Sequence, residues 1–160
     1  MPKKPNQQRL ADELGKRDAF SCLRQETYLN LVRTHEQLYS ELARFFKSHG
    51  LSDAQYNALR ILRGEGKPMH VHQIADRMIF ENTDISRLID RLHAAGLICR
   101  DRCGEDRRVV WISLTEKAKK TLKTMDRPLL QIHESHFGDL DDRELATLNK
   151  LLFRSRQHPK

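Results

Sequence analysis

The stretch Ile98–Leu114 constrains the fold more than any other part of the chain. Its sequence, ICRDRCGEDRRVVWISL, has two runs with alternating apolar residues around a polar centre that ends in Asp106, Arg107 and Arg108. Two such runs around a short segment that contains glycine are typical of a β-hairpin. We therefore expect a hairpin whose tip presents guanidinium groups.

The segment directly before this hairpin, residues 82–96, predicts an amphipathic helix that ends at Gly96. One helical face is apolar and is predicted to lie in the core; it consists of Ile85, Leu88, Ile89 and Leu92. Polar residues lie largely off that face in its first turns: Asn82, Thr83, Asp84, Ser86 and Arg87. A helix with a short polar face followed by a basic hairpin is the arrangement with which a winged helix reads DNA.

Further helices are predicted before this pair. Apolar residues at a spacing of three or four indicate one long helix from about residue 17 to 49. Ser52 and Gln55 form a capping-box pattern, so a second helix is expected from about Asp53. A short third helix is expected around residues 71–78, after a break rich in glycine and proline. Only a few residues then separate it from the helix at 82–96, which is the spacing of a helix-turn-helix.

Two helices are predicted after the hairpin. Thr115 is placed to cap a fifth helix toward Phe137, in which Pro128 is expected to cause a kink or an interruption. Asp141 and Glu144 form a second capping box, which predicts a sixth helix to about residue 154. The fold class is therefore mainly α with a small β-hairpin wing.

The composition indicates which class of partner and which cellular location to expect. Twenty-nine Lys and Arg residues against 22 Asp and Glu give a formal net charge of +7, which favours anionic partners. No apolar run reaches the ~18 residues of a membrane span, and the N-terminus lacks the apolar core of a signal peptide. Three cysteines are too few, and odd in number, for a secreted disulfide framework. We expect a cytoplasmic protein that does not contact a membrane.

The long amphipathic segments at both ends predict a homodimer. A monomer of 160 residues would struggle to bury their apolar faces, whereas pairing across a two-fold axis would cover them. We expect a single domain over residues 1–160. Within it, 1–16 is predicted as a flexible basic tail, about 51–115 as the DNA-reading lobe, and about 17–49 and 116–155 as dimerisation helices.

The chain resembles the MarR family of bacterial transcription regulators over about residues 31–152. The sharpest part is GLICRDRCGEDRRVVWISLTEKAKK, which is similar to the family's wing and the start of its fifth helix; DISRLIDRLHAAG is similar to its recognition helix. His70 departs from the family pattern, where Ser or Thr is a commoner cap, and so does Ala118, where Gly is frequent. The resemblance implies a dimeric winged-helix regulator of palindromic operators, most often a repressor, that responds to small molecules.

Under this resemblance Arg107 and Arg108 belong to the wing. Arg108 is predicted to enter the minor groove, where narrow A·T-rich segments attract guanidinium groups, and Asp106 would orient the wing arginines. A charged hairpin tip by itself is more often only exposed to solvent and has no binding role. The tip of this chain follows directly after a recognition-type helix, and this position favours a role in DNA binding.

The first turns of the recognition helix are predicted to contact bases and phosphates. Arg87 could bind guanine with two hydrogen bonds, and Ser86 and Thr83 could serve bases or phosphates; Asn82 occupies the same turns. Asp84 could accept from cytosine or stabilise the helix start, and we favour the structural role. Gln73, with His72 beside it, is a candidate for phosphate contact, although a solvated helix face explains both equally well.

A sensing role has three weaker candidates. His35, Tyr39 and Tyr56 could line an effector pocket between the dimerisation helices and the DNA-reading lobe, although packing explains them more simply. Cys22 stands near the start of the first helix, where some peroxide-sensing members carry a reactive cysteine, but a buried inert thiol is the simpler expectation. His133 and His136 could bind a regulatory metal with a residue of the first helix, His35 or Glu36. Ordinary surface histidines are the better explanation, so we expect no metal and no cofactor.

Other function classes have less support. The chain has no phosphate-binding glycine loop, no G-x-S-x-G elbow and no HExxH, so an enzyme is not expected. A redox- or metal-sensing regulator of the same fold remains an alternative. A basic winged-helix protein that binds RNA, or serves as an adaptor, also remains open.

Overall fold

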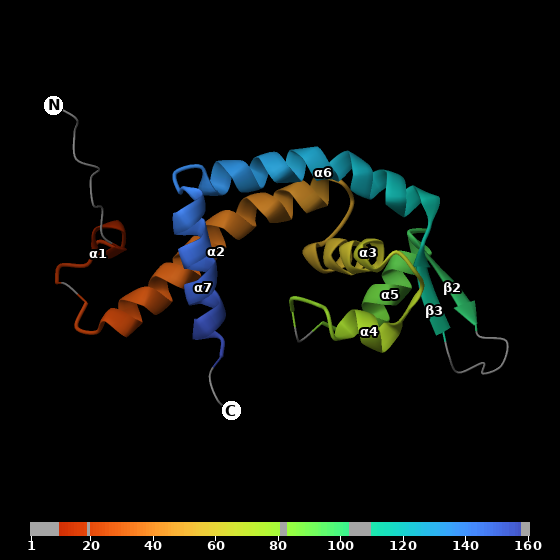
Figure 1. The fold of residues 1–160 in the computed structure, drawn as a ribbon, viewed down its shortest axis with the longest axis horizontal. Helices are drawn as coiled ribbons and strands as arrows, with labels where there is room; N and C mark the ends of the chain where they lie inside the picture. The colour runs from red at the N-terminus through yellow and green to blue at the C-terminus, as the bar shows by residue number, and fades with distance from the viewer. Residues whose placement is uncertain (1–9, 19, 81–82, 103–109, 158–160) are drawn as a thin grey trace. The chain divides into compact units, whose positions relative to one another are not determined.

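The computed structural model describes residues 10–18, 20–80, 83–102 and 110–157 (Figure 1). Its elements in chain order are α1 (Leu10–Glu13), α2 (Leu23–Ser48), α3 (Asp53–Glu65), β1 (Met69–His70), α4 (Val71–Ala75), α5 (Ile85–Ala94), β2 (Ile98–Arg102), β3 (Val110–Leu114), α6 (Glu116–Phe137) and α7 (Asp142–Ser155). The predicted mainly α fold with a small β wing is confirmed. The chain forms two compact units, residues 1–42 and 43–160, and each is described by itself.

The first unit contains α1 and most of α2. Leu10 is buried, and Nε of Arg33 lies 4.0 Å from a carboxylate oxygen of Glu13. Within the predicted flexible tail, residues 10–13 form a helical turn that contains the buried Leu10; the flexibility of residues 1–16 stays a prediction. Helix α2 also begins at Leu23, later than the start near residue 17 that the apolar spacing predicted.

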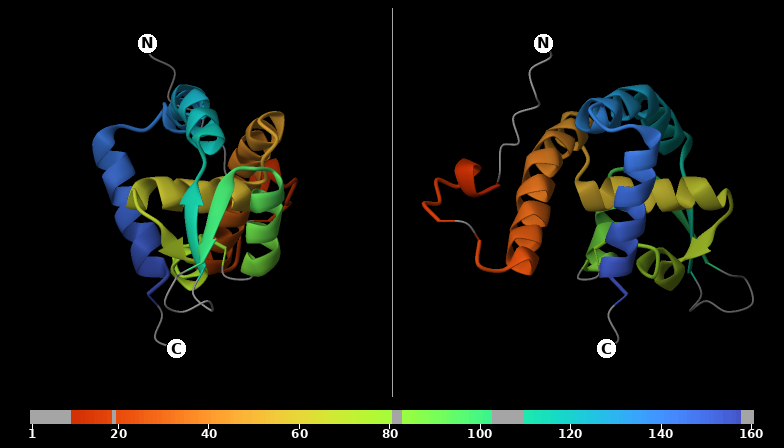
Figure 2. Two further views of the ribbon diagram at one scale, coloured as in Figure 1. Left: turned by 90° about the vertical axis from the view of Figure 1, so that its right-hand side faces the viewer. Right: turned by 60° about the vertical axis from the view of Figure 1, so that its left-hand side comes forward.

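The second unit contains a three-stranded antiparallel sheet in the order β1-β3-β2. Arg100 of β2 pairs with Ile112 of β3, and Ile112 also pairs with Met69 of β1. Strand β1 was not predicted, because two residues are too few to produce an alternating pattern. Figure 1 shows β2 and β3 extending as a ribbon beyond the helices α3, α4 and α5, and the left view of Figure 2 looks onto the two strands lying side by side.

The core of the second unit joins its helices to this sheet. Its most buried large side chains are Leu59, Met69, Ile74, Leu92, Ile112, Leu122 and Met125. On α5, Leu88, Ile89 and Leu92 are buried as predicted, whereas Ile85 is only half-buried because it occupies the first turn of the helix. Helix α5 is thus attached to the unit by one apolar face, and its polar face is outward.

The two helix starts predicted from capping boxes are confirmed by their hydrogen bonds. The Ser52 hydroxyl accepts from the Gln55 N–H at 3.2 Å, and Gln55 Oε1 accepts from the Ser52 N–H at 2.8 Å. Asp141 and Glu144 form the same reciprocal pair at the start of α7. Each pair satisfies two N–H groups that have no partner within the helix.

Helix α6 runs through Pro128 without a break, so the alternative of an interruption is wrong. Proline removes one hydrogen bond from a helix interior. Buried Met125 and Leu129 flank Pro128, and α6 packs against α3. These contacts hold both sides of the proline in one helix.

Within the part of the chain that the structure describes, no helix combines the length and the apolar character that a bilayer crossing requires.

Candidate nucleic-acid interface

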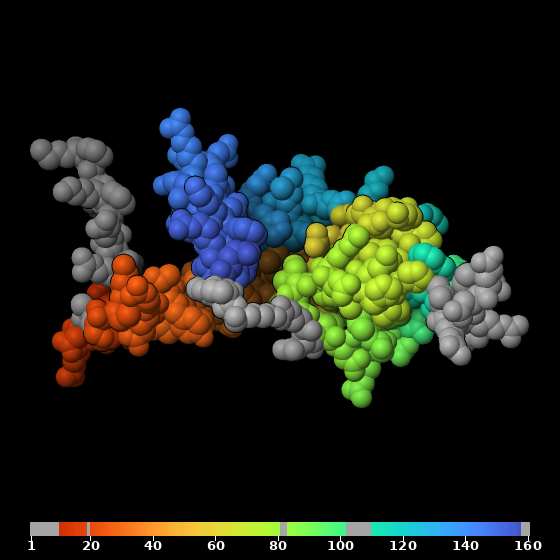
Figure 3. All heavy atoms as spheres, turned by 60° about the horizontal axis from the view of Figure 1, so that its bottom comes forward, coloured from red at the N-terminus to blue at the C-terminus, as the bar shows by residue number. Residues whose placement is uncertain are grey.

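Helices α4 and α5 and the strands β2 and β3 provide the surface predicted to contact DNA. Figure 3 shows the atoms of α4 and α5, yellow-green to green, lying at the surface on this side of the unit. Ser86 and Arg87 are exposed there, and the Arg87 side chain is 79% exposed. The first turns of α5 are therefore available for contact with a large ligand.

Asp84 fixes the start of α5. Its Oδ1 accepts from the Arg87 N–H at 3.1 Å, and its Oδ2 lies 3.2 Å from Arg87 Nε. The same carboxylate thus caps the helix and orients the guanidinium. A two-bond contact between Arg87 and guanine would use the two terminal nitrogens of the guanidinium, which point away from Nε.

Two further predicted residues have local hydrogen bonds. The Thr83 hydroxyl donates to the Phe80 carbonyl oxygen at 2.9 Å, directly before α5. Gln73 Oε1 accepts from the His70 N–H at 2.9 Å, at the start of α4. The amide nitrogen of Gln73 is the group that suits a phosphate oxygen, since the amide oxygen is already an acceptor within the chain.

An aromatic stack lies beside the start of α4. The rings of His70 and Trp111 have centroids 3.7 Å apart, and those of His70 and His72 are 5.5 Å apart and nearly parallel. His70 therefore links α4 to the wing strand β3, and exposed His72 continues the stack outward.

Asn57 was missed by the sequence reasoning. It lies on α3 with only 3% of its surface exposed, and its Oδ1 accepts from the Ile79 N–H at 3.0 Å. Ile79 belongs to the turn between α4 and α5, so this hydrogen bond holds the helix-turn-helix turn against α3. The available signal was a polar residue directly before the apolar pair Ala58 and Leu59.

The other end of α5 is held by residues at the start of α6. The Thr115 hydroxyl donates to the Gly96 carbonyl at 2.8 Å and accepts from the Ala118 N–H at 3.2 Å. Lys117 Nζ donates to the Ala95 carbonyl at 2.7 Å. One threonine therefore caps α6, as predicted, and also satisfies a carbonyl just beyond the recognition helix.

The remaining predicted DNA contacts fall on residues outside the described ranges. They are Asn82, Asp106, Arg107 and Arg108, so their roles stay predictions.

The residues of the predicted effector pocket each pack on an aromatic neighbour. In the first unit, His35 and Tyr39 stack with centroids 5.2 Å apart. In the second unit, Tyr56 stacks on Phe46 at 4.5 Å, and burial raises the pKa of the Tyr56 hydroxyl against the opposing effect of nearby arginines. A pocket shared by the three residues stays a prediction.

The other sensing candidates lie on exposed parts of the chain. Cys22 is exposed directly before α2, so the expectation of a buried thiol is wrong: the chain reaches this position before its first long helix begins. No group of three or more His, Cys, Asp or Glu side chains within the described ranges could hold a metal ion. His133 is exposed on α6, and His136 lies edge-on to Phe137.

Comparison with known proteins gives the same assignment. The MarR family model matches residues 49–109. A crystal structure of a MarR transcription factor from Planctomyces limnophilus is 42% identical, covers 84% of this chain and 98% of that chain, and has a TM-score of 0.65. The chain belongs to the MarR family. The relatives that it matches are transcription regulators and not enzymes.

Two further comparisons show the range of similarity. The uncharacterised HTH-type transcriptional regulator YpoP from Bacillus subtilis is 30% identical over 121 residues, which are 76% of this chain and 84% of YpoP. BpsR from Bordetella bronchiseptica, 21% identical with a TM-score of 0.75, covers 88% of this chain and all of its own and shares the fold. The alignments with the regulators YkoM and PapX cover 65% and 53% of those proteins, less than two thirds of each.

Proposed function

We propose that this MarR-family protein is a cytoplasmic, homodimeric repressor that binds a pseudo-palindromic operator and is released by a small-molecule effector. The observation that carries the proposal is the recognition helix α5. Its apolar face is buried, its start is capped by Asp84, and Arg87 stands exposed beside that cap. An exposed guanidinium held by a neighbouring carboxylate suits the reading of a base edge.

Dimerisation is supported by apolar surface near the C-terminus. Leu140, Leu151 and Phe153, in or next to α7, have 36%, 52% and 58% of their surface exposed. A second copy related by a two-fold axis would cover such residues and place two α5 helices in successive major grooves. Half-sites one helical turn apart, ~10 bp, would follow.

The effector part of the proposal has support from a fold relative. The DNA binding of BpsR is regulated by 6-hydroxynicotinic acid. A comparable ligand would need different affinities for the DNA-bound and released conformations of this chain. His35, Tyr39 and Tyr56 are the residues we propose for its pocket.

The test is to sequence the fragments of genomic DNA that the purified protein retains, and then to titrate the protein with an enriched fragment. We expect repeated half-sites and tighter binding of that fragment than of a random duplex of equal length. Equal affinity for a random duplex, or tighter binding of structured RNA, would contradict the proposal and favour a general nucleic-acid-binding role.

The wing has a separate test. Replacing Arg108 with Ala is expected to weaken operator binding and to lower the slope of log K against log salt by about 0.9 for each phosphate that Arg108 neutralises. Measuring binding between 50 and 200 mM salt (roughly the range over which such slopes are resolved) gives the slope. An unchanged affinity and slope would remove Arg108 from the interface.

A further inference from the structure

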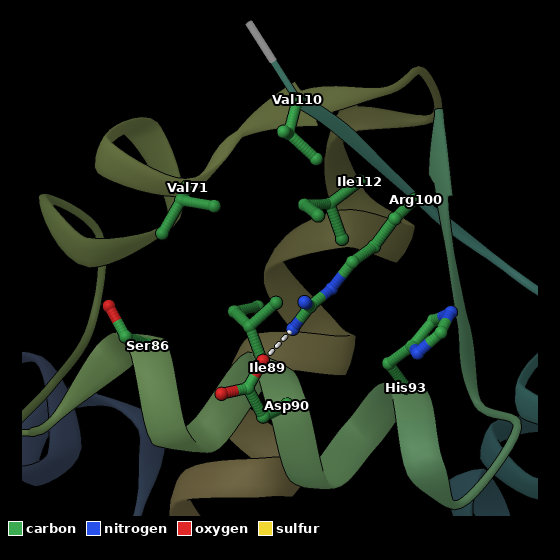
Figure 4. A pocket seen from close by; sticks show the side chains of 8 residues that line it. All are labelled: Val71, Ser86, Ile89, Asp90, His93, Arg100, Val110 and Ile112. Carbon is green, nitrogen blue, oxygen red and sulfur yellow. Dashed lines mark hydrogen bonds and ion pairs between the residues drawn. The ribbon is translucent and has the colours of Figure 1, made fainter. Parts of the chain in front are cut away.

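Asp90 and Arg100 connect the recognition helix to the wing. Arg100 Nη2 lies 2.5 Å from Asp90 Oδ1. Figure 4 shows the Arg100 side chain extending from its strand past Ile112 to the Asp90 carboxylate on α5. This ion pair therefore joins α5 directly to the wing strand β2.

The ion pair borders a groove between α5 and the wing. The groove has a volume of about 400 Å³, is partly open to solvent, and lies between α5, the wing strands and the start of α4, while α5 packs on β2 beside it. Its lining includes Ile89 and Ile112, which are buried, and both members of the ion pair. Where a groove lies between two elements, fewer packing contacts fix their relative orientation.

We propose that Asp90 and Arg100 form a positioning pair that sets the orientation of the wing strands against α5, so that the two DNA-contacting elements act as one unit. This positioning role rests on the DNA-binding function proposed above. A hydrogen bond between a guanidinium and a carboxylate has a preferred direction as well as charge attraction. Because Arg100 pairs with Ile112 in the sheet, a fixed Arg100 also places β3.

The pair is not required for folding stability. Its side chains are 32% and 66% exposed, and exposed ion pairs contribute little to the free energy of unfolding, about 0–1 kcal/mol. The expected effect of breaking the pair is therefore on DNA binding.

The direction of the change in operator affinity distinguishes a positioning role from a purely electrostatic one. Asp90→Asn removes a negative charge from a helix that faces phosphates, so charge alone would strengthen DNA binding; Arg100→Met would weaken it. If the two residues act as a positioning pair, both variants weaken operator binding. We expect at least about a threefold loss for each, within the range for contacting residues.

The experiment measures operator and random-duplex affinity for Asp90→Asn, Arg100→Met and the double variant Asp90→Arg/Arg100→Asp. We expect both single variants to lose operator affinity, Asp90→Asn to keep or gain random-duplex affinity, and the exchanged pair to recover most of the operator affinity. Stronger operator binding by Asp90→Asn, or an exchanged pair no better than the single variants, would overturn the proposal.

Asp126→Asn is the matched control. Asp126 pairs with Arg63 at 2.8 Å between α6 and α3, with side chains 52% and 36% exposed. The Asp126→Asn substitution therefore breaks an Arg–Asp pair of similar exposure that contacts neither α5 nor the wing. Operator affinity within about twofold of wild type is expected, since substitutions away from such contacts have small effects.

Amide hydrogen exchange of the free proteins tests the pair without DNA. Peptides within residues 85–102 should exchange faster in Asp90→Asn and Arg100→Met than in wild type and Asp126→Asn. Unchanged exchange would overturn the positioning role. A wild-type protein that does not prefer its operator would instead contradict the proposed function, and the exchange result would still decide the role of the pair.

Discussion

Helices α5 and α7 belong to the same compact unit but differ in how fully one chain supports them. Helix α5 buries Leu88, Ile89 and Leu92 and has hydrogen bonds from other elements near both ends. Helix α7 has a complete capping box at its start but no buried residue, and Leu151 and Phe153 are exposed.

This difference between α5 and α7 shows that a helix can have a complete cap at its start without being stabilised by tertiary packing. The capping box explains why α7 begins at Asp142, but caps contribute only about 1 kcal/mol. Most helix stability in proteins comes from packing of the apolar face. One chain supplies that packing for α5; for α7 we propose that a second copy supplies it.

The largest expected effect comes from a charge on the apolar face of α7. Leu151→Glu should prevent two copies from pairing there, because a buried carboxylate without a partner is costly. Since the two half-sites then no longer act together, operator affinity should fall by about 100-fold or more. Sedimentation equilibrium and operator titration measure the two effects.

Asn149→Glu places the same carboxylate two residues away, on an exposed position of α7. This control should stay dimeric and keep its operator affinity. A dimeric Leu151→Glu protein would show that α7 is not the dimer contact. A second copy would then not be what covers the apolar face of α7.

The next effect concerns the turn before α5. Asn57→Leu keeps the branching at Cγ but is larger and cannot accept from the Ile79 N–H, and an unsatisfied buried donor costs about 1–3 kcal/mol. We expect a loss of this size in the free energy of unfolding in urea. Operator affinity should also fall more than affinity for a random duplex.

The same substitution at exposed Asn149 should change the free energy of unfolding by less than about 0.5 kcal/mol. If Asn57→Leu is as stable as Asn149→Leu, the Asn57 hydrogen bond is not what fixes the turn.

A smaller effect is expected at the junction of α5 and α6. Thr115→Val keeps the shape of the side chain but loses both hydrogen bonds of the hydroxyl, whereas Thr115→Ser keeps them. Thr115→Val should lower the free energy of unfolding by about 0.5–2 kcal/mol, as for the removal of other N-caps. Equal stability of the Val and Ser variants in urea would argue against a shared cap.

The smallest effect concerns pH. A hydrogen bond from Arg77, and a second from Lys67, hold the pKa of the Glu65 carboxyl below its usual value of 4.5. Because this pKa is lower in the folded state, the stabilisation is present above about pH 4.5 and is lost as the pH falls through the lowered value. Glu65→Gln should therefore lose less thermal stability than wild type as the pH is lowered from about 6 to about 3, through the usual carboxyl pKa.

Glu134→Gln, an exposed change on α6, serves as the control for the pH series. If Glu65→Gln has the same acid sensitivity as wild type and Glu134→Gln, the Glu65 carboxylate does not contribute to the pH dependence of stability.

Features determined by neighbouring residues could be predicted from sequence. The capping boxes at Ser52 and Asp141, and the cap at Thr115, depend on residues three positions apart. The apolar face of α5 and the wing strands follow from periodicity. These patterns placed α3, α5, α6 and α7 and the ribbon of β2 and β3 correctly.

Features that depend on distant residues could not be predicted. Asn57 and Ile79 are 22 positions apart, Thr115 and Gly96 are 19 apart, and Asp90 and Arg100 are 10 apart on different elements. No local pattern reports such contacts, because they exist only once the helices and strands have packed. Strand β1 also depends on its partner, since its two residues form a strand only against β3.

The most direct test of the central claim is hydroxyl-radical footprinting of the wild-type protein on an enriched genomic fragment. We predict two symmetric half-sites of protected deoxyriboses, with centres one helical turn apart, ~10 bp. Protection of a single half-site, or uniform protection without preference for the fragment, would contradict a dimer that reads DNA with two copies of α5.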